Sequence, residues 1–195
     1  MIILASQSAS RRAMLEAAGI AFEALPARVD EDAAKAALAG LSPRDLADAL
    51  AELKAIKVSQ RAGPVLTLGS DSVVALHDGT LLDKPTSREE AAEHLARMSG
   101  QVHELWSAAV IAEHGAPVWR HVERARMHVR PLSPAFIEAY LDREWPAIGG
   151  CVGCYRIEGP GVQLFSRIEG SHFTILGLPL LAVVGYLRTR GMLPA

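Results

Sequence analysis

Apolar residues along the chain form short continuous runs that alternate with stretches of helical periodicity. Runs of four to eight apolar residues are typical of buried strands, and a repeat near 3.6 residues indicates a helix. The predicted strands or extended segments are Met1–Ala5, Phe22–Val29, Val65–Val74, Leu81–Lys84, Val102–His114, Val118–Val129 and Leu164–Ile168. The predicted helices are Ser8–Gly19, Ser42 to about Gln60, Ser87–Met98, Ser133–Asp142 and Leu178–Thr189.

Serine residues mark the starts of these helices. Ser8 or Ser10 can cap the first helix, and Ser42 precedes a proline at the first helical position of the next. Ser87 and Glu90 have the spacing of a capping box. Because strands and helices alternate, and one neighbouring strand pair is joined by a short turn, the pattern predicts an α/β fold with a mixed sheet. No repeat or linker appears, so we expect residues 1–195 to form a single domain.

Composition and charge exclude several classes of protein. The formal net charge of −2 provides no general field for a nucleic-acid polymer, so any binding of anions must be local. No apolar run approaches the roughly 18 residues of a membrane span, and the first residues lack the basic start of a signal peptide. The two cysteines are three residues apart and imply no disulfide framework. We therefore expect a cytoplasmic protein without membrane or nucleic-acid partners.

The first turn, SQSASRR, contains hydroxyls and guanidinium groups where a strand leads into a helix. A helix N-terminus offers unpaired N–H groups and a positive dipole end, which favours a phosphate. Ser6, Ser8 and Arg11 or Arg12 could complete such a site. The alternative is that Ser8 only caps the helix and both arginines lie in solvent.

Further candidates are acidic and basic residues in the segments GSDSVV and LLDKPTS. Asp71 lies inside an apolar strand, where a carboxylate is costly to bury unless it meets a cation, so it could hold Mg²⁺ or orient a water. Lys84 could be a point charge against phosphate. A carboxylate at an exposed strand end and a solvated lysine are the alternatives.

Glycine-rich sequence surrounds the two cysteines, Cys151 and Cys154. Their C-x-x-C spacing is compatible with a redox motif or half of a zinc site, but no second pair exists to complete four ligands. Glu31 belongs to an acidic cluster that could help to bind a divalent ion, with a solvated loop as the alternative. His103 and His172 are expected near polar turns, without a partner for a triad.

Taken together, these stretches resemble the Maf family. LASQSASRRAML, the VDE at residues 29–31, GSDSVV, LLDKPTSREEAAEHLARMSGQVHE and GCYRIEGPG…IEG…LGLPL follow one another in the order of that family. The resemblance implies an elongated mixed sheet flanked by helices, with two lobes around a deep cleft as in the inosine-triphosphatase type. It also implies hydrolysis of a nucleoside triphosphate to the monophosphate and pyrophosphate with Mg²⁺ or Mn²⁺. A homodimer is a further expectation.

The resemblance also assigns roles to individual residues. Asp71 is the expected general base, with Glu31 and Asp71 at the metal and the attacking water. The expected substrate-binding residues are Ser6, Ser8, Arg11, Arg12, Lys54, Lys84, Cys151 and Glu158.

Two departures from the family pattern bear on the base that is bound. Where many members have lysine and glutamine, this chain has Cys151 and Glu158, which is similar to the branch acting on 7-methylguanosine triphosphate. A carboxylate can accept hydrogen bonds from the N1–H and N2 edge of guanine, which a pyrimidine does not offer. That branch typically has tryptophan where Ser10 stands, so hydrolysis of dTTP or UTP stays open.

Two other functions compete with catalysis. The same site could bind a nucleotide without turnover, as a regulator of septum formation, or Cys151 and Cys154 could make this a thiol protein. The presence of Glu31, Asp71 and Lys84 together favours an enzyme, because a sensor needs no water-orienting carboxylate.

Overall fold

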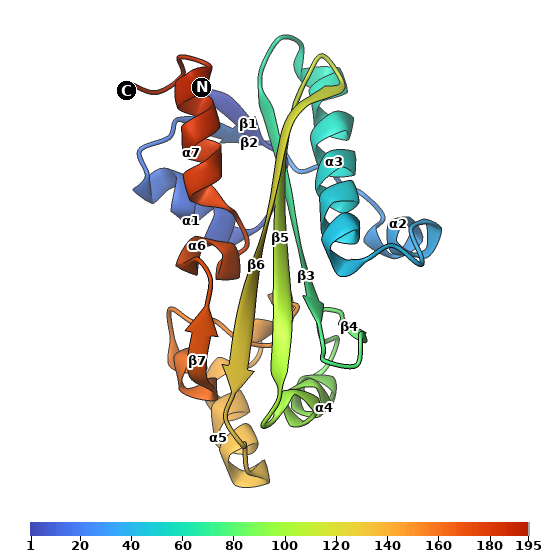
Figure 1. Cartoon of the computed structure of the whole chain (residues 1–195), viewed down its shortest axis with the longest axis vertical. Coiled ribbons are helices and arrows are strands. Elements are labelled where there is room, and N and C mark those ends of the chain that lie inside the picture. Colours follow the sequence, from blue (N-terminus) through green and yellow to red (C-terminus); the bar gives the residue numbers. More distant parts are fainter. Residues whose placement is uncertain (195) are drawn as a thin grey trace. The chain divides into compact units, whose positions relative to one another are not determined.

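The strands predicted from the sequence come together in one mixed sheet. The computed structural model describes residues 1–194, and its seven strands have the order β2-β1-β3-β5-β6-β7, with β4 paired to β3 (Figure 1). The strands are β1 (Ile2–Leu4), β2 (Phe22–Ala24), β3 (Thr67–Ala75), β4 (Leu81–Leu82), β5 (Val102–Glu113), β6 (Ala116–Val129) and β7 (Phe165–Glu169). The α-helices are α1 (Ala9–Ala17), α2 (Glu31–Ala37), α3 (Pro43–Ala62), α4 (Arg88–Met98), α5 (Pro134–Glu144), α6 (His172–Ile175) and α7 (Leu180–Thr189). The predicted α/β class and mixed sheet are confirmed.

The chain divides into two compact units. Unit 1 comprises residues 1–72, 107–123 and 172–195, and unit 2 comprises residues 73–106 and 124–171. Strands β3, β5 and β6 each contribute residues to both units.

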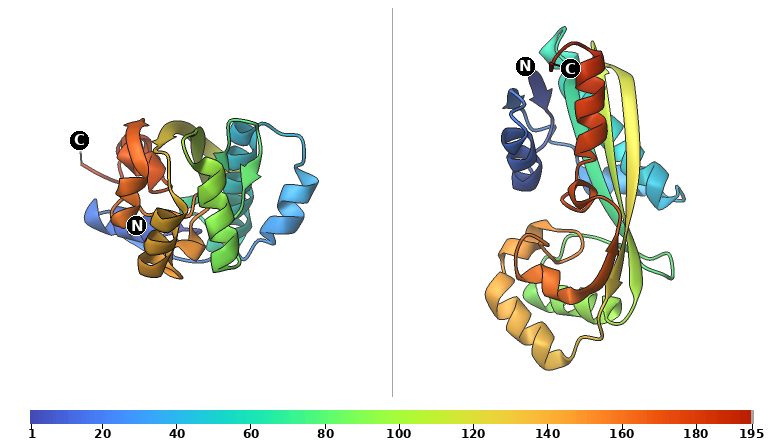
Figure 2. Two further views of the ribbon diagram at one scale, coloured as in Figure 1. Left: turned by 90° about the horizontal axis from the view of Figure 1, so that it is seen from below. Right: turned by 60° about the vertical axis from the view of Figure 1, so that its left-hand side comes forward.

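In unit 1, the alternation of side chains along β1 separates two cores. Ile2 and Leu4 pack with Leu15 of α1 and Val183 of α7, whereas Ile3 packs on the other side with Val58 of α3. The pictures accordingly show α1 and α7 on one side of these strands and α3 on the other (Figures 1 and 2). Parallel pairing of β1 with both β2 and β3 fixes the register between them.

Gly69 allows α3 to lie directly against β3. A Cβ atom on Gly69 would lie 2.6 Å from the backbone nitrogen of Ala55 and 2.9 Å from its Cβ, and it would also clash with the carbonyl oxygen of Ala51. Any side chain at residue 69 would therefore push the helix away from the strand. Lys54, which lies between these two alanines in sequence, is thereby held close to β3.

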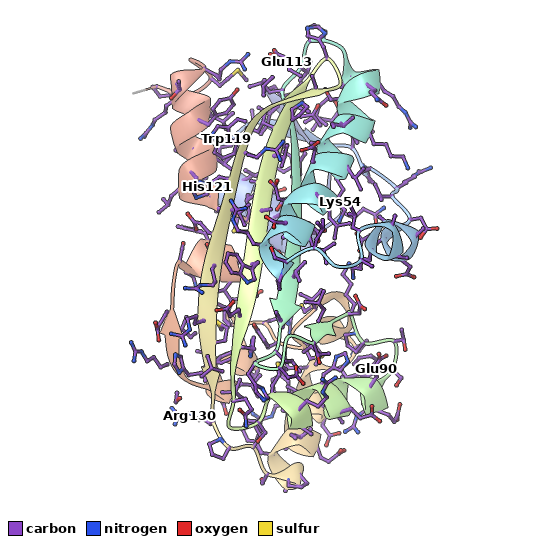
Figure 3. The ribbon with its side chains drawn as sticks, turned by 45° about the vertical axis from the view of Figure 1, so that its right-hand side comes forward. Lys54, Glu90, Glu113, Trp119, His121 and Arg130 are labelled. Carbon is purple, nitrogen blue, oxygen red and sulfur yellow. The ribbon has the colours of Figure 1, made fainter. Side chains whose placement is uncertain are left out.

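The hairpin between β5 and β6 is tighter than predicted. The sequence suggested a turn over residues 114–117, but β6 begins at Ala116 and only His114 and Gly115 connect the strands. Both connecting residues have positive φ, 51° and 77°, as a type I′ turn requires. On β6, Trp119 (Figure 3) stacks on Tyr186 of α7, with ring centroids 5.1 Å apart. This contact joins the hairpin to α7.

Unit 2 contains the antiparallel additions to the sheet. Val74 of β3 pairs with Leu82 of β4, and Met127 of β6 pairs with Ile168 of β7. Helices α4 and α5 contact each other and are joined at the surface by Arg88, which binds Glu138 at 2.7 Å. In the described part of the chain, no helix is long and apolar enough to cross a membrane.

Three local features differ from the sequence-based expectations. The acidic segment, for which a solvated loop was the alternative interpretation, is helix α2, because Asp30 caps it by accepting from the Ala33 N–H at 3.0 Å. The extended segment expected to reach Val29 forms a strand only as far as Ala24. Only half of the predicted capping box forms: Ser87 accepts from the Glu90 N–H at 3.1 Å, but the Glu90 carboxylate accepts from the Thr86 N–H, at 2.7 Å.

Candidate functional site

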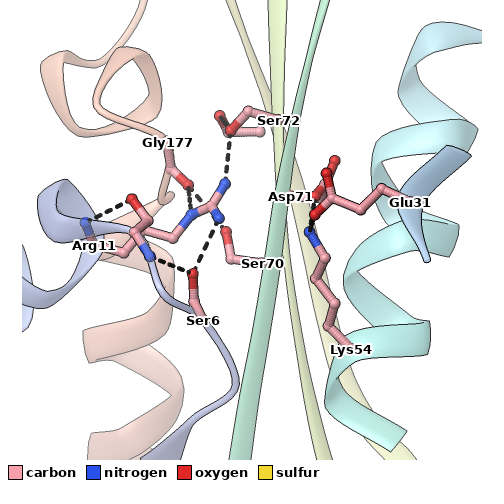
Figure 4. A network of polar contacts seen from close by, with 10 residues as sticks. Ser6, Arg11, Glu31, Lys54, Ser70, Asp71, Ser72 and Gly177 are labelled. Carbon is pink, nitrogen blue, oxygen red and sulfur yellow. Dashed lines mark hydrogen bonds and ion pairs between the residues drawn. The ribbon is translucent and has the colours of Figure 1, made fainter. Parts of the chain in front are cut away.

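A buried arginine lies at the start of α1, directly after β1. Ser8 caps the helix by accepting from the Arg11 N–H at 3.4 Å, as the spacing predicted. Arg11 is only 9% exposed, so its guanidinium group does not lie in solvent. Arg12, in contrast, is exposed. Arg11 donates through Nε to the Gly177 carbonyl at 2.7 Å, through Nη1 to Ser6 Oγ at 3.4 Å and through Nη2 to Ser72 Oγ at 3.1 Å (Figure 4). These contacts join the turn after β1, strand β3 and the segment after α6.

The strand segment GSDSVV presents alternating faces to two groups of polar side chains. Ser70 and Ser72 lie toward Arg11, and Asp71 lies toward α3 (Figure 4). Ser70 donates to the same Gly177 carbonyl at 3.0 Å. These polar residues do not interrupt the strand, because both hydroxyls are hydrogen-bonded and Asp71 meets a cation.

A lysine joins the two acidic residues that the sequence singled out. Lys54 from α3 lies between Asp71 of β3 and Glu31, the first residue of α2, and its Nζ is 2.6 Å from Glu31 Oε1 (Figures 3 and 4). Lys54 and Asp71 are both buried, with 10% of each side chain exposed, and Glu31 is about one-third exposed at 35%. A buried carboxylate needs such a partner, which explains why α3 carries a lysine on its inner face.

Arg11 and the two carboxylates influence one another electrostatically. Burial lowers the pKa of Arg11, and the negative charges of Asp71 and Glu31 oppose that shift. The guanidinium thus lies in a poorly solvated position, within the electrostatic influence of both acids. The free-energy cost of burying the guanidinium is offset by its hydrogen bonds to neutral oxygen atoms and by the nearby negative charges.

The oxygen donors of this cluster suit a hard divalent cation. Two carboxylates converge on one point, and Mg²⁺ is commonly bound by one or two carboxylates together with substrate phosphates and waters. No group of three or more His, Cys, Asp or Glu side chains suited to a metal occurs among residues 1–194. A cation held by Glu31 and Asp71 would therefore keep most of its coordination for other ligands.

In unit 2, three further predicted residues come together. The pKa of the Cys151 thiol is raised by burial and by the charge of Glu158, while Arg156 and Lys84 act in the opposite direction. The charges of Lys84 and Glu158 thus both act on the Cys151 thiol. Glu158 and Lys84 are exposed and Cys151 is partly buried, so this group can meet a ligand.

The loop that carries Cys151 and Glu158 is anchored at three consecutive residues. Tyr140 donates to the Cys154 carbonyl at 3.1 Å, and Tyr155 forms a 2.9 Å hydrogen bond with His103. Arg156 donates twice to one oxygen of the buried Glu144, at 2.9 and 2.8 Å. The middle of the loop is thereby fixed, while Glu158 is exposed and Cys151 is partly buried.

The thiol alternative gains no support from the structure. Both cysteines are free, and burial together with the nearby thiol raises the pKa of Cys154 to about 12. Its Sγ lies 3.5 Å from His94 Nδ1, but a thiol with so high a pKa is neither a ready nucleophile nor a ready metal ligand. Cys154 therefore belongs to the packing of unit 2.

His103 is a core residue that follows closely on a turn, as the sequence predicted. It lies in β5 with 1% of its surface exposed, beside the rings of Tyr155 and Phe165. Burial lowers the pKa of His103 to about 4. The turn at Ser99 and Gly100 ends just before β5 begins at Val102, so the predicted nearby turn is confirmed, although the His103 side chain itself is buried.

We expect the buried His103 to make the protein sensitive to acid. Between pH 6.5 and about 4 the unfolded imidazole binds a proton that the folded one excludes, so stability falls as the pH falls. At pH 5 this amounts to about 2 kcal/mol relative to neutral pH. Urea unfolding at pH 7 and pH 5 measures it, with His103→Gln as the non-titrating comparison. Equal losses in both proteins would contradict the assignment.

The predicted residues are divided between the two units. Unit 1 holds Ser6, Ser8, Arg11, Arg12, Glu31, Lys54 and Asp71, and unit 2 holds Lys84, Cys151 and Glu158. Sequence reasoning missed Ser70, Ser72 and Gly177, which hold Arg11 or the strand beside it. The alternation of hydroxyls around Asp71 was a signal for the two serines, but nothing local points to Gly177.

The fold and the site together define a mixed α/β protein with a candidate site for an anion and a divalent cation. A family model described as Maf-like protein matches residues 1–190, and the chain belongs to this Maf-like family. A protein from Sphingopyxis alaskensis named nucleoside triphosphate pyrophosphatase is 53% identical over 195 residues, which cover 99% of this chain and 98% of that protein. A protein from Jannaschia sp. named nucleoside triphosphate pyrophosphatase 1 is 55% identical over 193 residues, with 98% and 97% coverage.

One solved structure also aligns with the chain over most of its length. It is a nucleoside-triphosphatase, or dITP/XTP pyrophosphatase, from Mycobacterium abscessus, with 17% identity, a TM-score of 0.45, and 99% and 97% of the two chains covered.

Proposed function

We propose that this protein is a nucleoside triphosphate pyrophosphatase, which hydrolyses its substrate to the nucleoside monophosphate and pyrophosphate. The observation that carries the proposal is the cluster in unit 1, where Lys54 joins Asp71 and Glu31 close to the buried Arg11. The names of relatives that match almost the whole chain support the same activity. This cluster supplies both a base for water and cations for a polyphosphate.

The residues of the cluster divide the chemical work between them. Asp71 accepts the proton of the water that attacks the α-phosphorus, and Lys54 keeps that carboxylate oriented. Three N–H groups of the Arg11 guanidinium are hydrogen-bonded to the protein. Its remaining N–H groups stabilise negative charge on the phosphate oxygens. Ser6, Ser8 and Arg12 are proposed to complete this binding turn, and Lys84 to bind the leaving pyrophosphate. No nucleophilic side chain is needed, because phosphoryl transfer rests mainly on positioning and charge.

We further propose that activity requires Mg²⁺ or Mn²⁺, with Glu31 and Asp71 as its protein ligands. When bound, the ion would neutralise charge on the phosphate oxygens. The carboxylate pair that converges on Lys54 supports this, because its oxygens are of the type that both ions prefer. Lys54 is further proposed to contact the substrate phosphates as a cation while it keeps its contact with Asp71.

A panel of ordinary and modified nucleoside triphosphates tests the proposed function. Pyrophosphate release is measured with Mg²⁺, with Mn²⁺ and with excess chelator. We expect the monophosphate and pyrophosphate as products, and we expect excess chelator to abolish turnover. Binding of a nucleotide without turnover under every metal condition would contradict catalysis and favour a regulatory role instead.

For the preferred base we propose 7-methylguanine, bound by Glu158 and Cys151. Methylation at N7 gives the purine a positive charge, and the exposed carboxylate of Glu158 provides an acceptor of opposite charge. Lys84 and Arg156 lie near enough to influence the same loop, which therefore has mixed charge. Hydrolysis of dTTP or UTP is the competing outcome of the same substrate panel.

Glu158→Gln is expected to reduce the preference for 7-methylguanosine triphosphate over UTP by roughly tenfold, because a charged hydrogen bond becomes neutral. The measurement is the ratio of kcat/KM values for the two substrates. Glu93→Gln, at an exposed acid of α4 in the same unit, is the matched control. An unchanged ratio in Glu158→Gln would contradict base recognition by this residue.

We also propose that residues 1–195 work as one domain in the cytoplasm, on a small nucleotide and not on a nucleic-acid polymer. The net charge of −2 supports a local site over a broad basic surface. A homodimer is expected from the family resemblance, and sedimentation measures it.

A further inference from the structure

A chain of hydrogen bonds through one half-buried and one buried hydroxyl group leads away from Arg11. Nη2 of Arg11 donates to Ser72 Oγ at 3.1 Å, and Ser72 Oγ is 2.8 Å from Ser107 Oγ on β5. Ser107 Oγ donates in turn to the carbonyl oxygen of Thr174 at 2.8 Å. Ser107 and Thr174 are both fully buried, at 0% exposure. Four segments of unit 1 are thereby connected by one hydrogen-bonded chain.

The direction of each hydrogen bond in this chain follows from the number of protons available. A hydroxyl has one proton, and that of Ser107 is used on the Thr174 carbonyl. Ser72 must therefore donate to Ser107, which leaves its oxygen free to accept from Arg11. Each hydroxyl accepts on one side and donates on the other, so the bonds polarise one another from the guanidinium to the main-chain carbonyl.

The segment that ends this chain also holds Arg11 from a second side. Gly177, three residues after Thr174, accepts from Arg11 Nε at 2.7 Å and from Ser70 Oγ at 3.0 Å. Its φ of 101° favours glycine, and a Cβ there would lie 3.2 Å from Ser72 Oγ. The guanidinium is thus oriented by neutral acceptors without loss of its positive charge. The same strand segment carries Asp71, so these contacts also set its backbone position.

We propose that Ser72 and Ser107 are positioning residues that orient the Arg11 guanidinium for binding the polyphosphate of the substrate. The inference rests on the proposed function and assigns to it two residues that contact Arg11 directly or through one hydroxyl. Loss of either hydroxyl removes an acceptor or a donor from a chain that ends on a charged group. The guanidinium then loses its fixed orientation while its charge is retained.

Binding of inorganic pyrophosphate in the presence of Mg²⁺, measured by calorimetry on the full chain, tests this role. Ser72→Ala removes a hydrogen bond to the charged guanidinium and is expected to weaken binding by roughly tenfold. Ser107→Ala removes the acceptor that orients the Ser72 hydroxyl toward Arg11, and a similar, roughly tenfold loss is expected. With a nucleotide substrate, KM is expected to rise more than kcat falls, because Arg11 contacts the phosphates before and during the reaction. Ser72→Thr, which keeps the hydroxyl on a strand residue, is expected to restore binding.

Two controls separate positioning from general loss of stability. Ser59 is also buried in unit 1, at 1% exposure, and accepts from the Gly115 N–H at 3.0 Å, so Ser59→Ala is the matched variant. It is expected to lower stability about as much as Ser107→Ala without weakening pyrophosphate binding. In an Arg11→Lys background the planar guanidinium group is replaced by a single ammonium group, which needs no such orientation. Ser107→Ala is then expected to change pyrophosphate binding less than twofold.

The outcomes of these titrations are decisive in either direction. Unchanged pyrophosphate binding in Ser107→Ala, equal weakening in Ser59→Ala, or a full tenfold effect in the Arg11→Lys background would overturn the inference. Absence of pyrophosphate binding by the wild-type protein would overturn it too. Wild-type protein that binds pyrophosphate but hydrolyses no triphosphate would contradict the proposed enzyme alone, because the role of the two serines is judged from binding.

Discussion

Asp71→Asn is expected to lower kcat by roughly 10²- to 10⁴-fold, the range that a positioned general base contributes. The amide is nearly the same size as the carboxylate but cannot take a proton from water at neutral pH. Lys54 keeps its contact with Glu31, so the buried ammonium is not left without a partner. The fold is therefore expected to survive, and the loss of turnover reports on chemistry.

The measurement combines steady-state pyrophosphate release with thermal unfolding of the same preparations. Asp48→Asn is the matched control, because Asp48 also lies in unit 1 and pairs with a cation, Arg120, at 2.6 Å. That variant loses an ion pair of α3 away from the cluster and should keep its turnover. Near-normal kcat in Asp71→Asn would show that this carboxylate is not the base.

The replacement of Asp71 also changes the expected response to metal. Removal of one of two proposed carboxylate ligands should raise the concentration of Mg²⁺ needed for half-maximal residual activity. A fall in kcat without any change in that concentration would assign Asp71 to the water alone and leave the ion to Glu31.

Gly69→Ala is expected to destabilise the protein by about 1–3 kcal/mol or more and to abolish most of its turnover. The added methyl group would meet the backbone of α3, at 2.6 Å from the nitrogen of Ala55, so the helix must move as a whole. Movement of α3 displaces Lys54 from Asp71. A single methyl group thus affects stability and the site through the same contact.

Chemical denaturation and steady-state kinetics test this expectation together. Gly185→Ala is the control, since a Cβ at this position in α7 has no heavy atom within 4 Å and alanine favours a helix. Ala55→Gly is not expected to rescue Gly69→Ala, because the closest atoms are backbone and remain after that change. Wild-type stability in Gly69→Ala would mean that α3 does not lie against β3 as described.

Much of the local structure could be predicted from neighbouring residues alone. Ser8, Ser42, Ser87 and Ser133 each cap the helix for which they were predicted, because a cap depends on a side chain and an N–H three residues away. The helix α2 was missed because its alanine-rich sequence has no apolar stripe to reveal a buried face, and none of its residues is buried.

The sequence by itself determined the order of strands and helices, the helix starts and the family motifs, since each depends on residues close together in the chain. Only the tertiary structure decided which charges meet. Lys54 reaches Glu31 and Asp71 from 23 and 17 residues away, and Arg11 reaches Gly177 across 166 residues. Such pairs are selected by the packing of α3 and α1 on opposite sides of the strands. A buried charge is stable only where that packing supplies a partner, so its identity cannot be inferred from local pattern.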